Sequence, residues 1–78
     1  MSSRKTLHEI LRLEEQGNWE AVEAVSLELI LAIKEGRSED VPNNIYRYVD
    51  DFDIRRKDEC YAEGQRKAVI AYLSSQEF

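Results

Sequence analysis

The sequence predicts an all-α protein, a small compact bundle of three to four helices. Glycines at positions 17 and 36 bound an apolar stretch, and apolar residues recur at helical spacing before and after it. A chain of 78 residues leaves room for one domain. We expect a single helical domain over 1–78, with frayed ends at about 1–4 and 75–78. A helical hairpin, about 6–16 and 19–35, should pack on helices at about 41–51 and 53–74.

The first helix is expected to begin at Thr6. Thr6 and Glu9 have the Thr-x-x-Glu spacing of a capping box, in which each side chain accepts from the backbone amide of the other residue. Leu7 and Ile10 follow at helical spacing. Gly17 suits the left-handed residue beyond the last turn, so the pattern predicts a helix of about three turns.

The second helix is the most apolar part of the chain. Asn18, directly after Gly17, is a favoured N-cap, so two helices can meet in a two-residue joint. From Leu27 to Ile33 only Glu28 interrupts the apolar residues, and this half of the helix is therefore apolar on almost every side. Such a surface needs partners all round. Either the rest of the chain covers it, or the protein forms a homodimer through this helix.

The segment from Gln16 to Ala21 resembles the joint between the paired helices of a tetratricopeptide repeat. In that family a glycine, a polar residue and an aromatic residue recur in this order, as Gly17, Asn18 and Trp19 do here. The chain departs from the family pattern at Val22, where a small residue is expected, and it contains no internal repeat. The resemblance implies a helical hairpin and no function.

A third helix is expected to open at Pro42. Proline lacks the amide hydrogen that the first turn of a helix leaves unpaired, and Asp40 is the expected cap. The aspartates between positions 50 and 53 are disfavoured at the end of a helix and favoured at the start of one. They predict a joint between the third and fourth helices.

The fourth helix contains a glycine with two interpretations. Cys60, Gly64 and Ala68 are spaced by four, so they form a strip of small side chains along one side, where a second helix can approach closely. The alternative is a break or bend at Gly64. The sequence does not choose between them.

Composition and charge exclude several classes of protein. Sixteen acidic and 11 basic side chains give a net charge of −5, which disfavours a general affinity for nucleic acid or anionic lipid. The single cysteine cannot form an internal disulfide and favours a reducing compartment. The first residues lack the apolar core of a signal peptide, and no apolar run approaches the roughly 20 residues that span a bilayer. We expect a cytoplasmic protein with no membrane association.

No cluster of residues predicts catalysis, a metal ion or a cofactor. His8 and Cys60 are the only residues of their types and lie on different predicted helices. The acids from 50 to 59 lack the spacing of a calcium loop, since Arg55 and Arg56 stand where the third acid and the glycine belong. We expect no enzyme.

Aromatic residues give the preferred functional hypothesis. Tyr46 and Tyr48 lie about 200° apart on a helix, so they cannot both face one core stripe, and aromatic residues are enriched at protein interfaces. We expect a small acidic interaction module, of a regulatory, adaptor or inhibitor type, that binds a protein partner through the aromatic face of the third and fourth helices. The expected partner contacts are Tyr46, Tyr48, Phe52, Tyr61 and Tyr72.

The alternative hypothesis is a nucleic-acid-binding regulator that uses the basic residues of the fourth helix. Its expected contacts are Arg55, Arg56, Lys57, Arg66 and Lys67. Acids interrupt this cluster, and the pairs Arg55 with Glu59 and Glu63 with Lys67 have the spacing of helical ion pairs. Together with the negative net charge, this makes nucleic acid the second choice.

Overall fold

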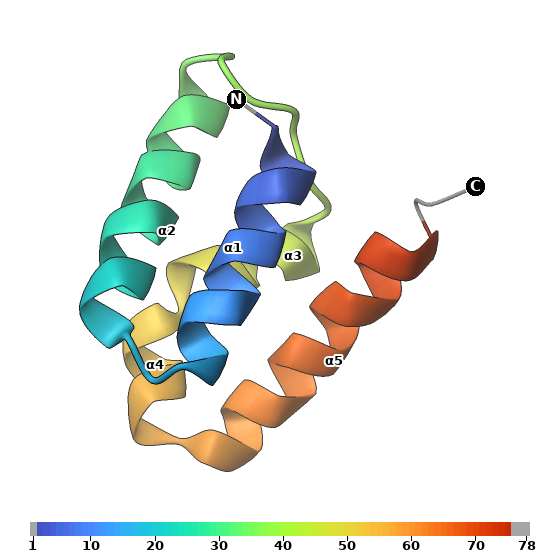
Figure 1. Ribbon diagram of the computed structural model, residues 1–78. Helices are drawn as coiled ribbons and strands as arrows, with labels where there is room; N and C mark the ends of the chain where they lie inside the picture. Colours follow the sequence, from blue (N-terminus) through green and yellow to red (C-terminus); the bar gives the residue numbers. More distant parts are fainter. Residues whose placement is uncertain (1, 76–78) are drawn as a thin grey trace.

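The computed structural model describes residues 2–75, and over that range the chain forms five α-helices and no strand (Figure 1). The expected all-α class is therefore confirmed. No helix in the described range is long and apolar enough to cross a bilayer. The helices are α1 (Ser3–Glu15), α2 (Trp19–Lys34), α3 (Asn43–Asp50), α4 (Phe52–Lys57) and α5 (Glu59–Ser75).

The hairpin of α1 and α2 forms as expected, because two glycines end the helices. Gly17 and Gly36 have φ angles of 73° and 76°, the left-handed region that other residues avoid. In each case the glycine amide and the next amide donate to carbonyls of the last turn, which satisfies groups that the helix leaves unpaired. Asn18 caps α2, since its side-chain oxygen accepts from the Ala21 amide at 3.3 Å.

The start of α1 differs from the expectation. The helix begins at Ser3 with Ser2 as its N-cap, and Thr6 lies buried in the first turns, where its hydroxyl donates to the Ser2 carbonyl at 2.9 Å. The capping box at Thr6 is therefore wrong, because Ser2 provides a cap one turn earlier. The Ser3 hydroxyl also lies 2.6 Å from that of Ser38. Fraying at about 1–4 and 75–78 stays a prediction, and residues 1 and 76–78 lie outside the described residues.

The joints around α3 are partly as predicted. Asp51 forms the turn between α3 and α4, which confirms a joint in the acidic segment. Pro42 occupies the cap position itself, without a side-chain hydrogen bond to the helix. Asp40 does not cap α3: its carboxylate accepts from the neighbouring Val41 amide at 2.9 Å.

The expected single helix from 53 to 74 is two helices. Asp58 has extended backbone angles, φ −131° and ψ 99°, and its carboxylate accepts from the Tyr61 amide at 3.1 Å. Asp58 is therefore the N-cap of α5, so α4 ends and α5 begins at this residue. α5 runs unbroken through Gly64, and a β-carbon added there would meet no atom within 4 Å. The helix therefore has no break at Gly64, and no second helix of residues 2–75 approaches it closely.

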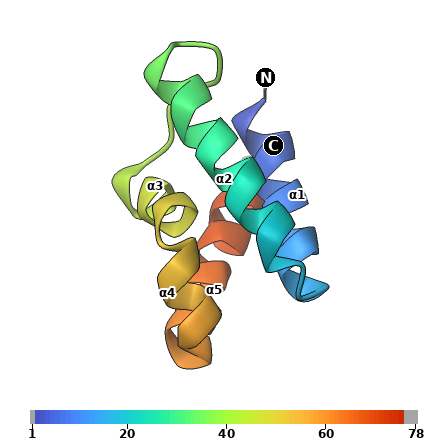
Figure 2. The same ribbon diagram turned by 90° about the vertical axis from the view of Figure 1, so that its left-hand side faces the viewer.

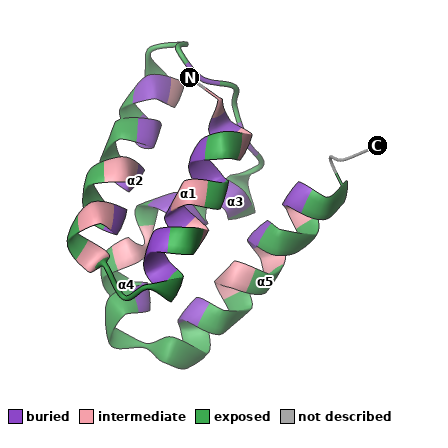
Figure 3. Cartoon of the chain, in the orientation of Figure 1, coloured by how far each residue is buried: buried purple, intermediate pink, exposed green. Residues whose placement is uncertain are grey.

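The core lies between the α1–α2 hairpin on one side and α3 and α5 on the other (Figure 3). α3 and α4 follow one another beside the hairpin, as the turned view shows (Figure 2). α5 packs against α3 and α4, and its contact with α1 is less extensive than the contact between α1 and α2. The buried apolar residues of this core are Leu7, Ile10, Leu13, Val22, Leu29, Ile30, Val41, Ile45, Tyr48, Val49, Val69 and Leu73.

Candidate interaction surface

The five residues of the expected aromatic face differ widely in exposure. Tyr48 is fully buried, because it shares its side of α3 with Ile45 and Val49, which also lie in the core. It is therefore a core residue and offers nothing to a partner. The other expected contacts divide by exposure. Tyr46, Phe52 and Tyr72 are partly buried against the core, and Tyr61 is the most exposed, at 37%.

A buried charge cluster joins α1, α3, α4 and α5. At its centre the Glu14 carboxylate is enclosed, with the residue 6% exposed. One of its oxygens, Oε1, accepts from the Tyr48 hydroxyl at 3.0 Å and from Arg55 Nε at 3.0 Å. The other, Oε2, accepts from Arg66 at 2.7 Å. Both oxygens are therefore occupied by donors from other helices, which accounts for an acid at this depth.

Arg55 is the largest fully buried side chain of the described residues, at 1% exposure. Its guanidinium pairs with Glu14, donates to the Tyr48 carbonyl and lies 3.8 Å from the centroid of the Tyr48 ring. Burial, followed by the charge of Glu14, raises the pKa of the Tyr48 phenol. The tyrosine therefore stays protonated and keeps donating to the carboxylate.

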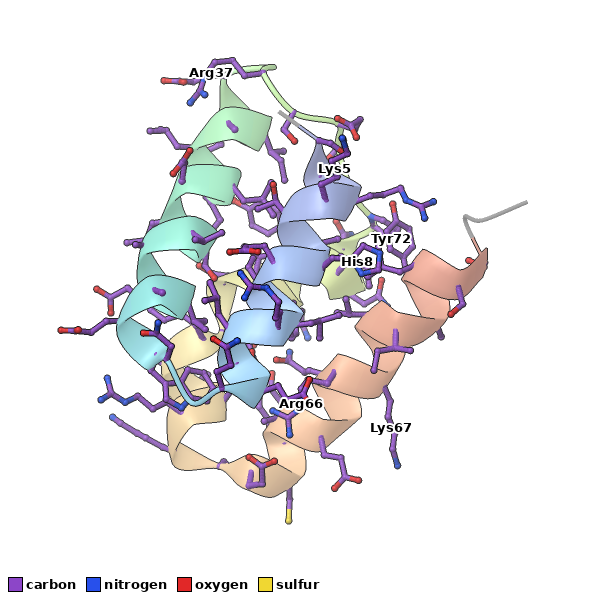
Figure 4. All side chains as sticks on the ribbon, viewed as in Figure 1. Lys5, His8, Arg37, Arg66, Lys67 and Tyr72 are labelled. Atoms are coloured by element: carbon purple, nitrogen blue, oxygen red, sulfur yellow. The ribbon has the colours of Figure 1, made fainter. Side chains whose placement is uncertain are left out.

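Arg66 closes the cluster at the surface. It bridges Glu14 and Glu59, and in Figure 4 it lies on the side of α5 that faces α1, whereas Lys67 points away. Partial burial lowers the pKa of Arg66, but hydrogen bonds to the two carboxylates outweigh this and raise it overall. The cluster thus has two acids and two bases, and its charges balance.

These contacts determine which of the predicted nucleic-acid contacts are accessible at the surface. Arg55 is inaccessible, so it cannot contact a phosphate. It pairs with Glu14 and not with Glu59, because the chain turns at Asp58 and separates the two helices. The expected pair of Glu63 and Lys67 is present at 3.6 Å. Arg56 and Lys57 remain exposed and line a small hollow of about 130 Å³ that also contains acids.

A groove that opens to solvent lies between α3 and α5. Its volume is about 650 Å³. The strip of small residues Cys60, Gly64 and Ala68 lies along its α5 side, where nothing in the described chain packs closely against Gly64. We call it the α3–α5 groove; its lining residues are Asn43, Asn44, Arg47, Cys60, Tyr61, Gly64, Gln65 and Ala68.

One end of the α3–α5 groove is held by a side-chain network. The Tyr61 hydroxyl donates to Asp51 at 2.6 Å, and the Gln65 amide lies 3.1 Å from the same hydroxyl. The hydrogen bond to Asp51 raises the pKa of Tyr61. Tyr61 is therefore positioned at the rim by neighbours on both sides, although it is exposed.

A second hollow, of about 740 Å³, lies between α5 and the hairpin joint. Leu11, Trp19 and Ile70 give it apolar walls, and Arg66 crosses it to reach Glu14. Its remaining lining is mainly acidic and ion-paired. The described residues contain no group of three or more histidine, cysteine or carboxylate side chains placed to hold a metal ion.

Comparison with known proteins gives no match: no protein family, no curated protein and no solved structure is significantly similar to this chain. The structure of the chain itself is therefore the basis for a function.

The sequence reasoning missed the buried cluster, although two signals were present. Glu14 continues the inner stripe of α1, four residues after Ile10 and seven after Leu7. Arg55 stands seven residues after Tyr48, so the two fall near one side if the helices are read as one. A charged residue in each of two core stripes, with opposite signs, indicates a buried pair.

Proposed function

We propose that this protein is a non-catalytic protein-interaction module that binds a segment of a partner in the α3–α5 groove. The groove is the observation that carries the proposal. It is open to solvent, has the small residues of α5 along one side, and is also lined by Asn and Gln side chains whose amides can hydrogen-bond to a partner backbone.

Arg47 defines the chemistry of the partner. It is the one charged residue among those that line the groove, in a chain whose net charge is −5. An apolar segment that carries a carboxylate near this arginine would meet a complementary charge, whereas the surrounding acidic surface repels other anionic ligands. Tyr61 adds a rigid aromatic side chain at the rim.

The non-catalytic part of the proposal is supported by the way the charged groups are engaged. Glu14, Arg55 and Arg66 form a cluster inside the fold in which both arginines pair with the one carboxylate. Their contacts serve packing between helices and leave no carboxylate oxygen of Glu14 free for a substrate.

The small side chain of Gly64 allows a sharp test. Gly64→Trp is designed to place an indole in the groove, and nothing lies within 4 Å of the added β-carbon, so the side chain has room to leave the helix. Gly64→Ala is the matched control, since it changes the same helix position and leaves the groove open. Both variants and the native chain are used to capture proteins from lysate of the source cells, followed by mass spectrometry.

The proposal predicts a partner that the native chain and Gly64→Ala recover and Gly64→Trp does not. The partner should also be lost with Arg47→Glu, which reverses the charge beside the groove. Recovery of the same proteins by Gly64→Trp, or the absence of any partner, would contradict the proposal. Retained nucleic acid in the captured material, lost with Arg56→Glu, would favour the alternative of a nucleic-acid-binding regulator.

A further inference from the structure

The small hollow between α2 and α4 has the volume of a small organic ligand. It measures about 130 Å³, which is room for about four water molecules. It is more enclosed than the α3–α5 groove and the hollow at the hairpin joint. Trp19 and Phe52, both partly buried against the core, form its apolar walls. Its other lining residues are the exposed side chains Glu23, Asp53, Arg56 and Lys57.

The four charged side chains of this hollow are not engaged with one another. Among residues 2–75, none of them takes part in an ion pair. The charges around the larger hollow at the hairpin joint differ in this respect, because Arg66 there pairs with Glu14 and Glu59, and Lys67 pairs with Glu63. Two carboxylates and two cationic groups are therefore available to a ligand in the hollow between α2 and α4.

The acids and the bases of the hollow lie toward opposite ends. α2 and α4 run in opposite directions, as both Figure 1 and Figure 2 show. Glu23 lies one turn beyond Trp19 on α2, and Asp53 lies at the start of α4. Arg56 and Lys57 are the last two residues of α4. Because the helices are opposed, both acids lie toward one end of the hollow and both bases toward the other.

We propose that this hollow binds a small zwitterion, of the class of free α-amino acids with a short apolar side chain. The ammonium group of the ligand lies beside the two acids and its carboxylate beside the two bases. The apolar side chain of the ligand packs against the two aromatic walls.

A ligand with a single charge fits the hollow less well. An anion that pairs with the bases also meets the two carboxylates, and a cation that pairs with the acids meets the two bases. Only a ligand with both charges is complementary to both ends. The hollow shares no lining residue with the α3–α5 groove, so this proposal and the proposed function stand or fall separately.

Trp19 provides the measurement, because it is the only tryptophan of the chain and lines the hollow. Its fluorescence is followed while the native protein is titrated with L-valine. We expect a saturable change with a dissociation constant of about 1 mM, as suits a ligand with few atoms. N-acetyl-L-valine lacks the positive charge and L-valinamide lacks the negative charge. Each should bind at least about tenfold more weakly than L-valine.

Two pairs of variants locate the ligand. Glu23→Gln and Lys57→Gln each remove one charge from one end of the hollow, and each should weaken L-valine by about threefold or more. Glu15→Gln and Lys67→Gln are the matched controls, since both residues are exposed and line the larger hollow that Trp19 also borders. These controls should leave the affinity for L-valine unchanged.

Three outcomes would overturn the proposal: no saturable change with L-valine, binding of either blocked derivative as tight as that of L-valine, or equal weakening by Glu15→Gln and Glu23→Gln. The second would show that the hollow recognises only one charge, and the third would place the ligand in the larger hollow. Gly64→Trp and Arg47→Glu should not change the affinity for L-valine, which keeps this test distinct from that of the α3–α5 groove.

Discussion

Replacing Glu14 by glutamine tests whether the buried cluster holds the helices together. Glutamine has nearly the same size, and its oxygen can still accept from Tyr48 and from Arg55 Nε. Its amide group, however, would present a donor to Arg66, which is itself a donor. Arg55 would keep its positive charge in a position that is 1% exposed, without a neutralising partner.

The expected loss in the free energy of unfolding is large for a protein of this size. Removing one partner of a buried ion pair costs about 3–5 kcal/mol. A domain of this length has a total stability of about 4–12 kcal/mol, so the change removes about a quarter of it or more. At about 4 °C per kcal/mol, the lower end of the range for small domains, the midpoint of thermal unfolding should fall by at least about 12 °C.

The measurement is thermal and urea unfolding followed by far-ultraviolet circular dichroism. Glu9→Gln is the matched control. Glu9 lies on the same helix and also pairs with an arginine, Arg12 at 2.7 Å, but both side chains are about half exposed. Exposed pairs contribute little, so this variant should unfold close to the native protein.

The reasoning is refuted if Glu14→Gln is no more destabilising than Glu9→Gln, since that would show that the cluster is hydrated or open in solution. A double variant adds a second check. Glu14→Leu with Arg55→Met replaces the buried pair by apolar side chains of similar volume, and such replacements are often neutral or stabilising. It should therefore be more stable than Glu14→Gln.

Three further changes test separate parts of the fold. Burial and the charge of Glu14 raise the pKa of Tyr48 above its ordinary value of 10.0, so the folded state retains a proton that the unfolded state loses. This group should leave stability unchanged below pH 10 and lower it as the pH rises further, and urea unfolding of Tyr48→Phe should show a smaller fall. Gly64→Ala should raise the unfolding midpoint by about 4–8 °C, because alanine favours a helix interior by about 1 kcal/mol and the site has space for the methyl group. Ser26→Ala should be neutral or stabilising in the same assay, since the buried Ser26 hydroxyl has no hydrogen-bond partner, and a clear loss would reveal one.

The sequence predicts those features that are set within a few residues. Gly17 and Gly36 end their helices because a left-handed backbone is required there, and Asn18 caps α2 through an oxygen three residues from its donor. The two helix boundaries that were predicted wrongly also depend on local capping, because more than one nearby residue can act as a cap. Ser2 and Thr6 are both competent caps, and Asp58 is a cap inside a continuous helical pattern. Only packing of the neighbouring helices decides between such candidates.

The candidate site was less predictable because it depends on contacts across the chain. Helical spacing separates Tyr46 from Tyr48 by about 200° but does not say which of them faces inward. The spacing of Cys60, Gly64 and Ala68 predicts a strip of small side chains on α5. Whether another helix covers this strip depends on the direction in which α5 runs after the turn at Asp58. The sequence places Arg55 at the surface because Glu59, four residues later, has the spacing of a helical ion pair. The turn at Asp58 separates these two residues, and Arg55 pairs with Glu14 in the core.

The buried cluster and the α3–α5 groove are parts of one arrangement. Arg55 donates to the carbonyl of Tyr48 on α3 and lies 3.5 Å from Gln65 on α5, so it ties both walls of the groove to α4. Asp51, at the turn after α3, accepts from Tyr61 and lies 3.4 Å from Gln65. The separation of α3 and α5 is thus set by polar contacts at one end, and the small residues of α5 leave the space between them unfilled. α3 and α5 pack against each other in the core, and the contacts of Arg55 add polar links between them at one end of the groove. We therefore expect loss of the buried ion pair to change the shape of the groove in which a partner is proposed to bind, as well as the stability of the fold.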